Sequence, residues 1–399
     1  MTGISSIRVR FKICLVHALA LATAVVFVQS FCLAEPKTMS EEELGKLLRK
    51  AENGSLNAQA ELARAYAVGR AGNINYEEAV RWYRRAADQG DPDSQTNLGV
   101  FYLTGRGVAR NDAEAVRWFQ RAASSGYPLA LHDLGIVYTN GWGVAKDPPH
   151  GFELLLRAAT AGVDVSQVDV AIAYLNGNAV PINPEMGITW LKRAVKHDLA
   201  SAHLLLGIAY ENGQGIAKDY KKAAEHYRKA ADQGLAAAQN NLGRLYLQGN
   251  GVAKDRAEGM RLFATAAEKG NQQSYLNLAA CHLSGCGGVI DPVEAYSWYL
   301  RAQASGTAIP QPFQERFSAI GDELTAEQLR RAQSVSNTWI AQHPEMDPRS
   351  PVQLNHVPAA TLMAREPRIL HNDDEVLKTL WRQTQFMPPP HSNNRDSVR

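Results

Sequence analysis

The chain has 399 residues, of which 45% are hydrophobic and 21% are charged, as in an ordinary soluble protein. Lys and Arg number 42 against 40 Asp and Glu, so the formal net charge is only +2. A chain so close to neutral has no electrostatic reason to gather nucleic acid or anionic membrane, and we expect neither as a partner.

Residues 1–34 have the pattern of a secretory signal peptide. Basic residues at positions 8, 10 and 12 precede an apolar run over residues 13–28, and Cys32 and Ala34 then occupy the −3 and −1 positions of a cleavage site. We predict cleavage after Ala34 and a periplasmic or secreted protein. The alternative is a retained membrane anchor, which the length disfavours, because a spanning helix needs about eighteen apolar residues or more. We expect membrane contact only in that alternative.

Residues 35–54 are expected to form an N-terminal capping helix. Leu44, Leu47 and Leu48 recur at helical spacing, and Gly54 provides a stop signal. Such an apolar stripe is suited to cover the first of the repeats that follow.

From residue 55 to residue 306 the sequence repeats with a period of 36 residues. One glycine column and one alanine column are complete: Gly69, Gly105, Gly141, Gly177, Gly213, Gly249 and Gly285, and Ala86, Ala122, Ala158, Ala194, Ala230, Ala266 and Ala302. Several columns in one register are not a chance match, so the sequence predicts seven tandem repeats.

Each repeat carries its own helix boundaries, as residues 91–126 illustrate. Pro92 suits the first turn of a helix, and Gly105 can take the positive φ that ends it. Asn111 begins a column of Asn or Asp residues that are expected to cap a second helix, which Gly126 ends. The pattern therefore predicts two helices of about three turns in every repeat.

A tryptophan column marks the predicted core. Trp82, Trp118, Trp190 and Trp298 lie at helical spacing among other apolar residues, which favours burial over a ligand-binding role. A single helix pair cannot hide its apolar face, so neighbouring repeats must stack. The sequence predicts an all-α solenoid.

The repeats resemble the Sel-1-like repeat, a relative of the tetratricopeptide repeat. The likeness is clear in residues 238–270, AQNNLGRLYLQGNGVAKDRAEGMRLFATAAEKG, and recurs over about 250 of the 399 residues. The resemblance implies a right-handed α-solenoid that acts as a scaffold or adaptor for protein complexes. It implies no shared active site, so no catalytic, cofactor-binding or metal-binding residue is carried over, and we expect neither an enzyme nor a small-molecule substrate.

A penicillin-binding or β-lactamase-like hydrolase is the alternative, because some cysteine-rich relatives are so described. Those relatives carry a cysteine pair in each repeat, whereas only the last repeat has one here. Sequence motifs of serine, metal-dependent and phosphate-binding enzymes are missing. The histidines are scattered, with His132 and His203 isolated on predicted helices.

Repeat four, residues 163–198, departs from the pattern. Ala171 and Ala179 replace glycines, and Asp198 stands where the other repeats have glycine. Asp tolerates the left-handed backbone region better than most residues. We expect a locally weaker stack in this repeat.

A polar column on the first helices is the predicted partner site. It consists of Glu61, Asn97, Asp133, Asp169, Asn241 and Asn277. Amides and carboxylates at regular intervals could bind a protein or peptide in the concave groove of a solenoid; the alternative is a solvated helix face. A second column, which includes Thr104, Asn140 and Ser284, lies so close to helix ends that bonds to local backbone are favoured.

Two cysteines, Cys281 and Cys286, remain after the predicted cleavage. An oxidising compartment permits a disulfide between them, and two reduced thiols are the alternative, because spacing alone does not fix the geometry.

The C-terminal part divides into two segments. Residues 307–342 are expected to hold a capping helix that begins at Thr325, with Gln328 completing a capping box. Residues 343–399 are rich in proline and are expected to be largely disordered.

Overall fold

A computed structural model describes residues 38–343 of the chain. This part consists of seventeen α-helices and one 3-10 helix, with no strand. None of its helices has the length and apolar character needed to cross a bilayer. The predicted signal peptide, residues 1–34, and the tail from residue 344 lie outside the described residues.

Each repeat forms two α-helices, as the sequence predicts. The first helices are α3 (Leu56–Ala67), α5 (Pro92–Thr104), α7 (Pro128–Asn140), α9 (Asp164–Asn176), α11 (Ala200–Asn212), α13 (Ala236–Gln248) and α15 (Gln272–Ser284). The second helices are α4 (Tyr76–Asp88), α6 (Asp112–Ser124), α8 (Pro148–Thr160), α10 (Pro184–Ala194), α12 (Tyr220–Asp232), α14 (Arg256–Glu268) and α16 (Pro292–Ala304). A short 3-10 helix, η1 (Val195–His197), follows α10.

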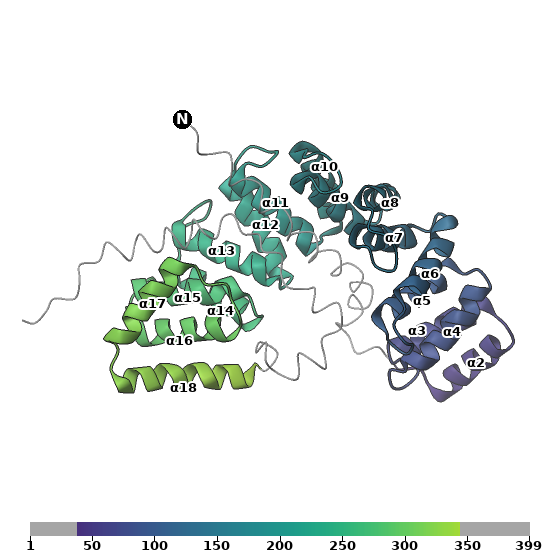
Figure 1. Cartoon of the computed structure of the whole chain (residues 1–399), viewed down its shortest axis with the longest axis horizontal. Helices are drawn as coiled ribbons and strands as arrows, with labels where there is room; N and C mark the ends of the chain where they lie inside the picture. The colour runs from purple at the N-terminus through teal and green to yellow at the C-terminus, as the bar shows by residue number, and fades with distance from the viewer. Residues whose placement is uncertain (1–37, 344–399) are drawn as a thin grey trace, which may run out of the picture. The chain divides into compact units, whose positions relative to one another are not determined.

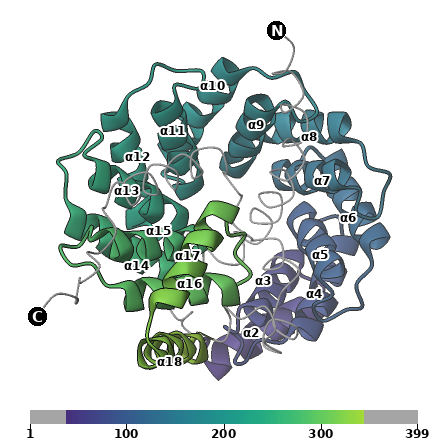
Figure 2. The same ribbon diagram turned by 60° about the vertical axis from the view of Figure 1, so that its left-hand side comes forward.

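The helices fall into two compact units. Within the described residues, unit 1 comprises 38–202 and 214–216, and unit 2 comprises 203–213 and 217–343. In each unit the two helices of a repeat lie side by side, and the second helix then packs on the first helix of the next repeat (Figure 1). In unit 1, the first helices α5, α7 and α9 form one layer and the second helices α6, α8 and α10 form another (Figure 2).

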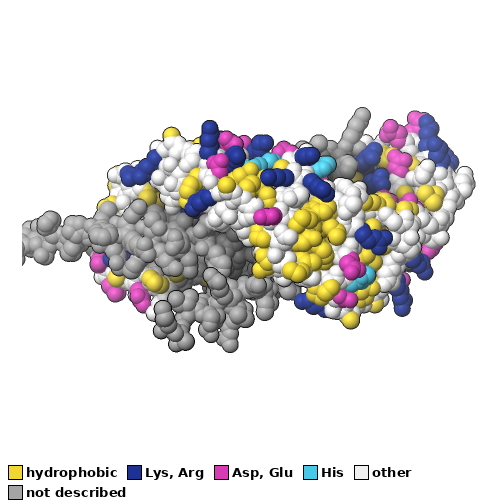
Figure 3. Space-filling view, turned by 90° about the horizontal axis from the view of Figure 1, so that it is seen from above, with side chains coloured by type: hydrophobic (Ala, Val, Ile, Leu, Met, Phe, Trp, Pro, Cys, Tyr) yellow, Lys and Arg dark blue, Asp and Glu magenta, His cyan; other side chains and the backbone are white. Residues whose placement is uncertain are grey.

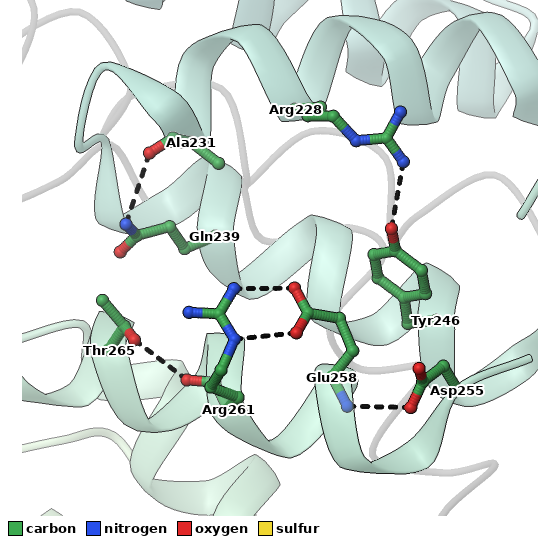
Figure 4. Close-up of polar contacts among 8 residues, drawn as sticks. All are labelled: Arg228, Ala231, Gln239, Tyr246, Asp255, Glu258, Arg261 and Thr265. Atoms are coloured by element: carbon green, nitrogen blue, oxygen red, sulfur yellow. Dashed lines mark hydrogen bonds and ion pairs between the residues drawn. The ribbon is translucent and has the colours of Figure 1, made fainter.

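The predicted Asn and Asp column caps the second helix in all seven repeats. In each case the side-chain oxygen accepts a hydrogen bond from the third backbone N–H of the helix, which satisfies one of its orphan donors. Figure 4 shows one example, in which the Glu258 N–H donates to Asp255 over 2.9 Å. The first helices of most repeats end at a left-handed glycine, such as Gly105 with φ +69°.

Buried glutamines tie each of four first helices to the helix before it. The side-chain amide of Gln239 donates to the carbonyl oxygen of Ala231 at the end of α12 (Figure 4). Gln59, Gln95 and Gln167 make the same bond to the carbonyl eight residues earlier. Each of these carbonyls also accepts from the N–H of the glycine that follows the helix, as Ala231 does from Gly234 over 2.8 Å, so the glutamine adds a second hydrogen bond to a C-terminal carbonyl.

The tryptophan column is buried, as predicted: Trp82, Trp118, Trp190 and Trp298 are between 1% and 9% exposed. Close packing within a repeat requires the small residues of the first helix. A Cβ added to Gly99 would lie 2.5 Å from the ring of Phe119, so the phenyl group occupies the space that glycine leaves.

A glycine in the loop of one repeat also lies against the start of the second helix of the preceding repeat. A Cβ at Gly107, Gly143, Gly215 or Gly251 would lie between 2.2 and 2.6 Å from backbone at the start of the preceding second helix. In repeat four Ala179 holds this position with φ +67°, and Asp198 takes the left-handed role of glycine with φ +54°. Among the described residues, these two are the only non-glycine residues with a positive φ.

We expect Ala179→Gly to raise the free energy of unfolding by about 0.5–1 kcal/mol. Left-handed backbone costs an L-residue roughly 1–2 kcal/mol, and the extra freedom of glycine in the unfolded chain returns part of that gain. Urea unfolding should show a higher midpoint. Ala173→Gly, in the interior of α9, is the control. It should lower the free energy of unfolding by about 1 kcal/mol and therefore give a lower urea midpoint. A lower midpoint for Ala179→Gly would show that the loop is not strained.

The ends of the array are helical. Helix α2 (Glu41–Glu52) begins at a capping box of Ser40 and Glu43, and it buries Leu47 and Ala51. Residues 307–342 hold two helices rather than the single helix that we predicted.

Helix α17 (Gln311–Glu323) is the helix that we did not predict, and it buries Phe313, Phe317 and Ile320. Helix α18 (Ala326–Gln342) begins at the predicted capping box of Thr325 and Gln328. The Trp339 ring of α18 lies 5.5 Å from the Tyr275 ring and 6.3 Å from the Trp298 ring, centroid to centroid.

Candidate functional site

The six residues of the predicted partner site do not share one environment. Glu61 is exposed on α3, whereas Asn97, Asp133 and Asn241 are half-buried on α5, α7 and α13. Asp169 is 9% exposed and Asn277 is 1% exposed. Four side chains can therefore meet a partner without rearrangement, and the other two lie in the interior of their units.

Polar side chains in the second column bond to their own helices. Thr104 Oγ1 donates to the Val100 carbonyl over 2.8 Å, and Asn140 Nδ2 donates to the Ile136 carbonyl over 2.9 Å. Ser284 makes a longer bond of 3.4 Å to the Cys281 carbonyl. At these three positions the bonds go to backbone within the same helix and not to the loop backbone near the glycines.

In unit 1, Asp169 belongs to a buried cluster with His132 and Ser166. The His132 Nδ1 atom lies 2.8 Å from Ser166 Oγ and 3.5 Å from Asp169 Oδ2. Burial lowers the pKa of His132 to about 4 and raises the pKa of Asp169 to about 8. The distance to Asp169 would suit an ion pair, but burial of both groups favours their neutral forms.

This Ser, His and Asp cluster is not a catalytic triad. Both oxygens approach the same ring nitrogen, whereas a triad needs the serine at one nitrogen and the carboxylate at the other. Ser166 is also 0% exposed and His132 only 2% exposed, so a substrate cannot reach them. The cluster gives no support to a hydrolase.

In unit 2, Asn277 belongs to an interior hydrogen-bond network. Its side-chain amide donates to Asn240 Oδ1 over 2.8 Å, and Ser274 Oγ donates to the same oxygen over 3.0 Å. The side chain of Asn277 therefore helps to join α15 to α13. In this repeat the polar residue of the column therefore has a structural role.

The sequence did not reveal a buried charged group in unit 2. The Arg244 guanidinium contacts both oxygens of Glu211, over 2.5 and 2.6 Å, and the Tyr227 hydroxyl donates to Glu211 over 2.7 Å. These side chains come from α13, α11 and α12. The signal in the sequence was weak: the column of Arg244 is apolar in five other repeats, at Val100, Ile136, Ile172, Ile208 and Ala280, but it also holds Arg64 in the first repeat.

His203, which we expected to be isolated on its helix, meets His226 in unit 2. Their Nδ1 atoms are 2.9 Å apart, so one ring donates to the other. Burial, and then the neighbouring His203, lower the pKa of His226 to about 4. The His226 ring also stacks on Tyr210 at 5.6 Å. Among the described residues, His, Cys, Asp and Glu side chains form no group of three or more that could hold a metal ion.

Cys281 and Cys286 are free thiols in the structure, so the predicted disulfide is not formed there. Cys281 is buried in the core cluster, and Cys286 is half-buried and packs against that cluster.

On the face drawn in Figure 3, basic and acidic side chains are interspersed, and neither sign forms a continuous surface of its own. Several are paired along one helix, as in the two hydrogen bonds of 2.7 Å between Arg261 and Glu258 (Figure 4). Exposed pairs of this kind contribute little to stability.

The repeats match a known family model along most of the described chain. The Sel1 repeat model matches seven consecutive segments: residues 56–91, 92–127, 128–163, 165–199, 200–235, 236–271 and 272–306. The chain belongs to the Sel1 repeat family. Sel1 repeat proteins generally act as protein-interaction scaffolds, and their solenoid fold is typically non-catalytic.

The chain is also similar to several solved structures. The Sel1 repeat protein from Oxalobacter formigenes is 28% identical with a TM-score of 0.56, and the match covers 63% of this chain and 98% of that one. The protective antigen c5321 of uropathogenic Escherichia coli strains is 24% identical with a TM-score of 0.43, covering 85% and 94% of the two chains. Immunity protein Pa5087 from Pseudomonas aeruginosa is 21% identical with a TM-score of 0.38, covering 53% and 81%. No match was found among curated proteins.

The stability of this Sel1 repeat array should fall as the pH rises from about 6.5 to 8. The folded state holds the Asp169 proton with a pKa of about 8, against about 3.9 in an unfolded chain. Its contribution is therefore complete below about pH 4 and is lost as the pH rises through about 8.

His132 changes stability with pH in the opposite direction, and it does so over a lower pH range. With a folded pKa of about 4, its contribution is complete above about pH 6.5 and is lost only as the pH falls toward 4. Burial also raises the pKa of Asp133, to about 7, which adds to the decline above pH 6.5. The fall in urea midpoint between pH 6.5 and pH 8 should become smaller in Asp169→Asn, with the part due to Asp133 remaining, and an unchanged fall would contradict the assignment.

Proposed function

We propose that this chain is a scaffold that binds a protein or peptide through the layer of first helices. The observation that carries the proposal is the row of reachable polar side chains, one from each of several consecutive repeats. In unit 1 the row consists of Glu61 on α3, Asn97 on α5 and Asp133 on α7. Asn241 on α13 stands at the same position in unit 2.

The chemistry of the row favours a partner that offers hydrogen-bond donors. Glu61 accepts through carboxylate oxygens, and Asp133, whose pKa burial raises to about 7, accepts through the oxygens of its carboxyl group. The Asn97 amide nitrogen donates one of its two N–H groups to the Asp93 carbonyl over 2.9 Å, so its amide oxygen stays available to accept a hydrogen bond from a partner. Backbone N–H groups of an extended peptide, or its basic side chains, supply donors at intervals along a chain.

The test compares two triple variants with similar composition. The first changes Glu61, Asn97 and Asp133 to alanine on the first helices. The control changes Glu77, Gln120 and Glu153, which are exposed on the second helices α4, α6 and α8 of the same three repeats. Each set removes two carboxylates and one amide, so the two variants differ mainly in the surface that they alter.

Binding is measured in two steps. A bait of residues 35–399 is used to capture proteins from cell-envelope extract, and the affinity of each purified partner is then measured by calorimetry. We expect the first variant to lose at least tenfold in affinity and the control to bind as the parent does. Equal loss in both, or loss in the control alone, would place the binding surface elsewhere.

We further propose that the chain acts in the periplasm or outside the cell, after removal of residues 1–34. The support is the sequence pattern of a basic stretch, an apolar run and small residues before Glu35. Intact mass and N-terminal sequencing of the protein from a periplasmic or culture fraction should give Glu35 as the first residue. A product that retains Met1 and sediments with membranes would overturn this proposal.

A further inference from the structure

The end of α15 places two cysteines next to each other. The Gly285 N–H donates to the Cys281 carbonyl, and the Cys286 N–H donates to the same carbonyl over 3.0 Å. Gly285 has φ +67°. These are features of a Schellman-type helix end, whose two outer residues bring their side chains into contact. In repeat seven those residues are Cys281 and Cys286, where other repeats have pairs such as Phe101 and Arg106.

The two thiols differ in access. Cys281 is 0% exposed and packs in the core cluster of α15 and α16, whereas Cys286 is half-buried at the edge of that cluster. The Cys286 sulfur lies 3.0 Å from Ser284 Oγ. A reagent from solution can therefore reach Cys286 but not Cys281.

The two thiols also differ in acidity. The hydrogen bond that Cys281 donates, followed by the Ser284 hydroxyl and the positive charges of Arg256 and Lys254, lowers the pKa of Cys286 to about 6. The bond to Cys286 and burial raise the pKa of Cys281 well above its ordinary value. At neutral pH the accessible sulfur is thus a thiolate and the buried one is a thiol.

We propose that Cys281 and Cys286 form a thiol–disulfide exchange site, in which Cys286 attacks a small disulfide and Cys281 resolves the product. This site lies on unit 2 and does not depend on partner binding by the first helices. It goes beyond a fixed structural disulfide, because the pair would cycle between two states.

The exchange is balanced in two steps. The Cys286 thiolate attacks one sulfur of a disulfide RSSR, which forms a mixed disulfide and releases one thiolate RS⁻. The Cys281 thiol then gives its proton to the RS⁻ released in the first step, and its sulfur attacks Cys286 Sγ, which forms the Cys281–Cys286 bond, breaks the mixed disulfide and releases the second RS⁻. The protein dithiol loses two electrons, and the disulfide RSSR gains them.

The first experiment follows glutathionylation of the full chain. The reduced protein is treated with oxidised glutathione at pH 7, quenched with acid, alkylated and analysed by peptide mass spectrometry, which resolves each cysteine. The parent should accumulate the Cys281–Cys286 disulfide. Cys281→Ser should stop at glutathione on Cys286, and Cys286→Ser should leave Cys281 unmodified. Circular dichroism checks that both variants keep the helical content of the parent.

The second experiment measures the thiolate directly. Between pH 7 and pH 8 the alkylation rate of Cys286 by iodoacetamide should change by less than about twofold, because a group of pKa 6 is already ionised. An ordinary thiol of pKa 8.5 would react about eightfold faster at the higher pH. An eightfold rise, glutathione on Cys281 in place of Cys286, or a native disulfide that excess reduced glutathione leaves intact would each overturn the proposal.

Discussion

Trp118→Ala is expected to lower the free energy of unfolding by about 3–5 kcal/mol, the range for removal of a buried aromatic side chain. Trp118 is 6% exposed on α6 and packs in a cluster with Trp82, Leu98 and Phe101. Its neighbour in the sequence, Phe119, packs in a separate cluster that includes residues of α7. The substitution would therefore open a cavity on the side of α6 that faces the preceding repeat.

The loss should be local as well as large. In a repeat array each repeat contacts only its neighbours, so unfolding can proceed in parts, and a single midpoint can hide the affected segment. Hydrogen exchange of amides in α5 and α6, measured beside urea unfolding, resolves this. Arg117→Ala, at an exposed position on the same helix, is the control and should change stability by less than about 0.5 kcal/mol. Equal exchange rates in Trp118→Ala and the control would contradict burial.

The repeat register and the helix boundaries could be predicted because they depend on local chemistry. Asn111 caps its helix through a hydrogen bond to a residue three positions away, and Gly105 ends one through its own backbone angle. Asp198 shows that the rule depends on conformation rather than on residue type, because it takes φ +54° where other repeats have glycine. Such features need no knowledge of the rest of the fold.

The environment of polar residues could not be predicted in the same way. Asn241 and Asn277 share a column, yet the first is half-buried and the second is 1% exposed. The difference arises because Asn277 meets Asn240 of the preceding repeat, a contact between residues 37 positions apart. Periodicity shows which helix face a residue lies on, but how deeply that residue is buried depends on the neighbouring helices.

Helix α17 was missed although its signal was present. Phe313, Phe317 and Ile320 recur at i, i+4 and i+7, and all three are buried. The prolines at 310 and 312 do not oppose a helix here, because proline is compatible with the first turn of a helix, where the missing N–H costs nothing.

Arg244→Met is expected to be as damaging as the loss of a core tryptophan, at about 3–5 kcal/mol. Arg244 is 4% exposed and Glu211 is 3% exposed, so the substitution would leave a carboxylate in the interior without its guanidinium. The Tyr227 hydroxyl, at 2.7 Å, would remain as a neutral donor and could offset only part of that charge.

A triple variant separates the cost of an uncompensated charge from the value of the ion pair itself. Glu211→Leu, Tyr227→Phe and Arg244→Met together remove every polar group of this contact, and apolar replacements of buried ion pairs are often neutral or stabilising. We expect the triple variant to recover most of the stability that Arg244→Met loses in urea unfolding. If the three changes instead lowered stability further than the single one, the Arg244–Glu211 pair would itself stabilise unit 2, beyond neutralising its own buried charges.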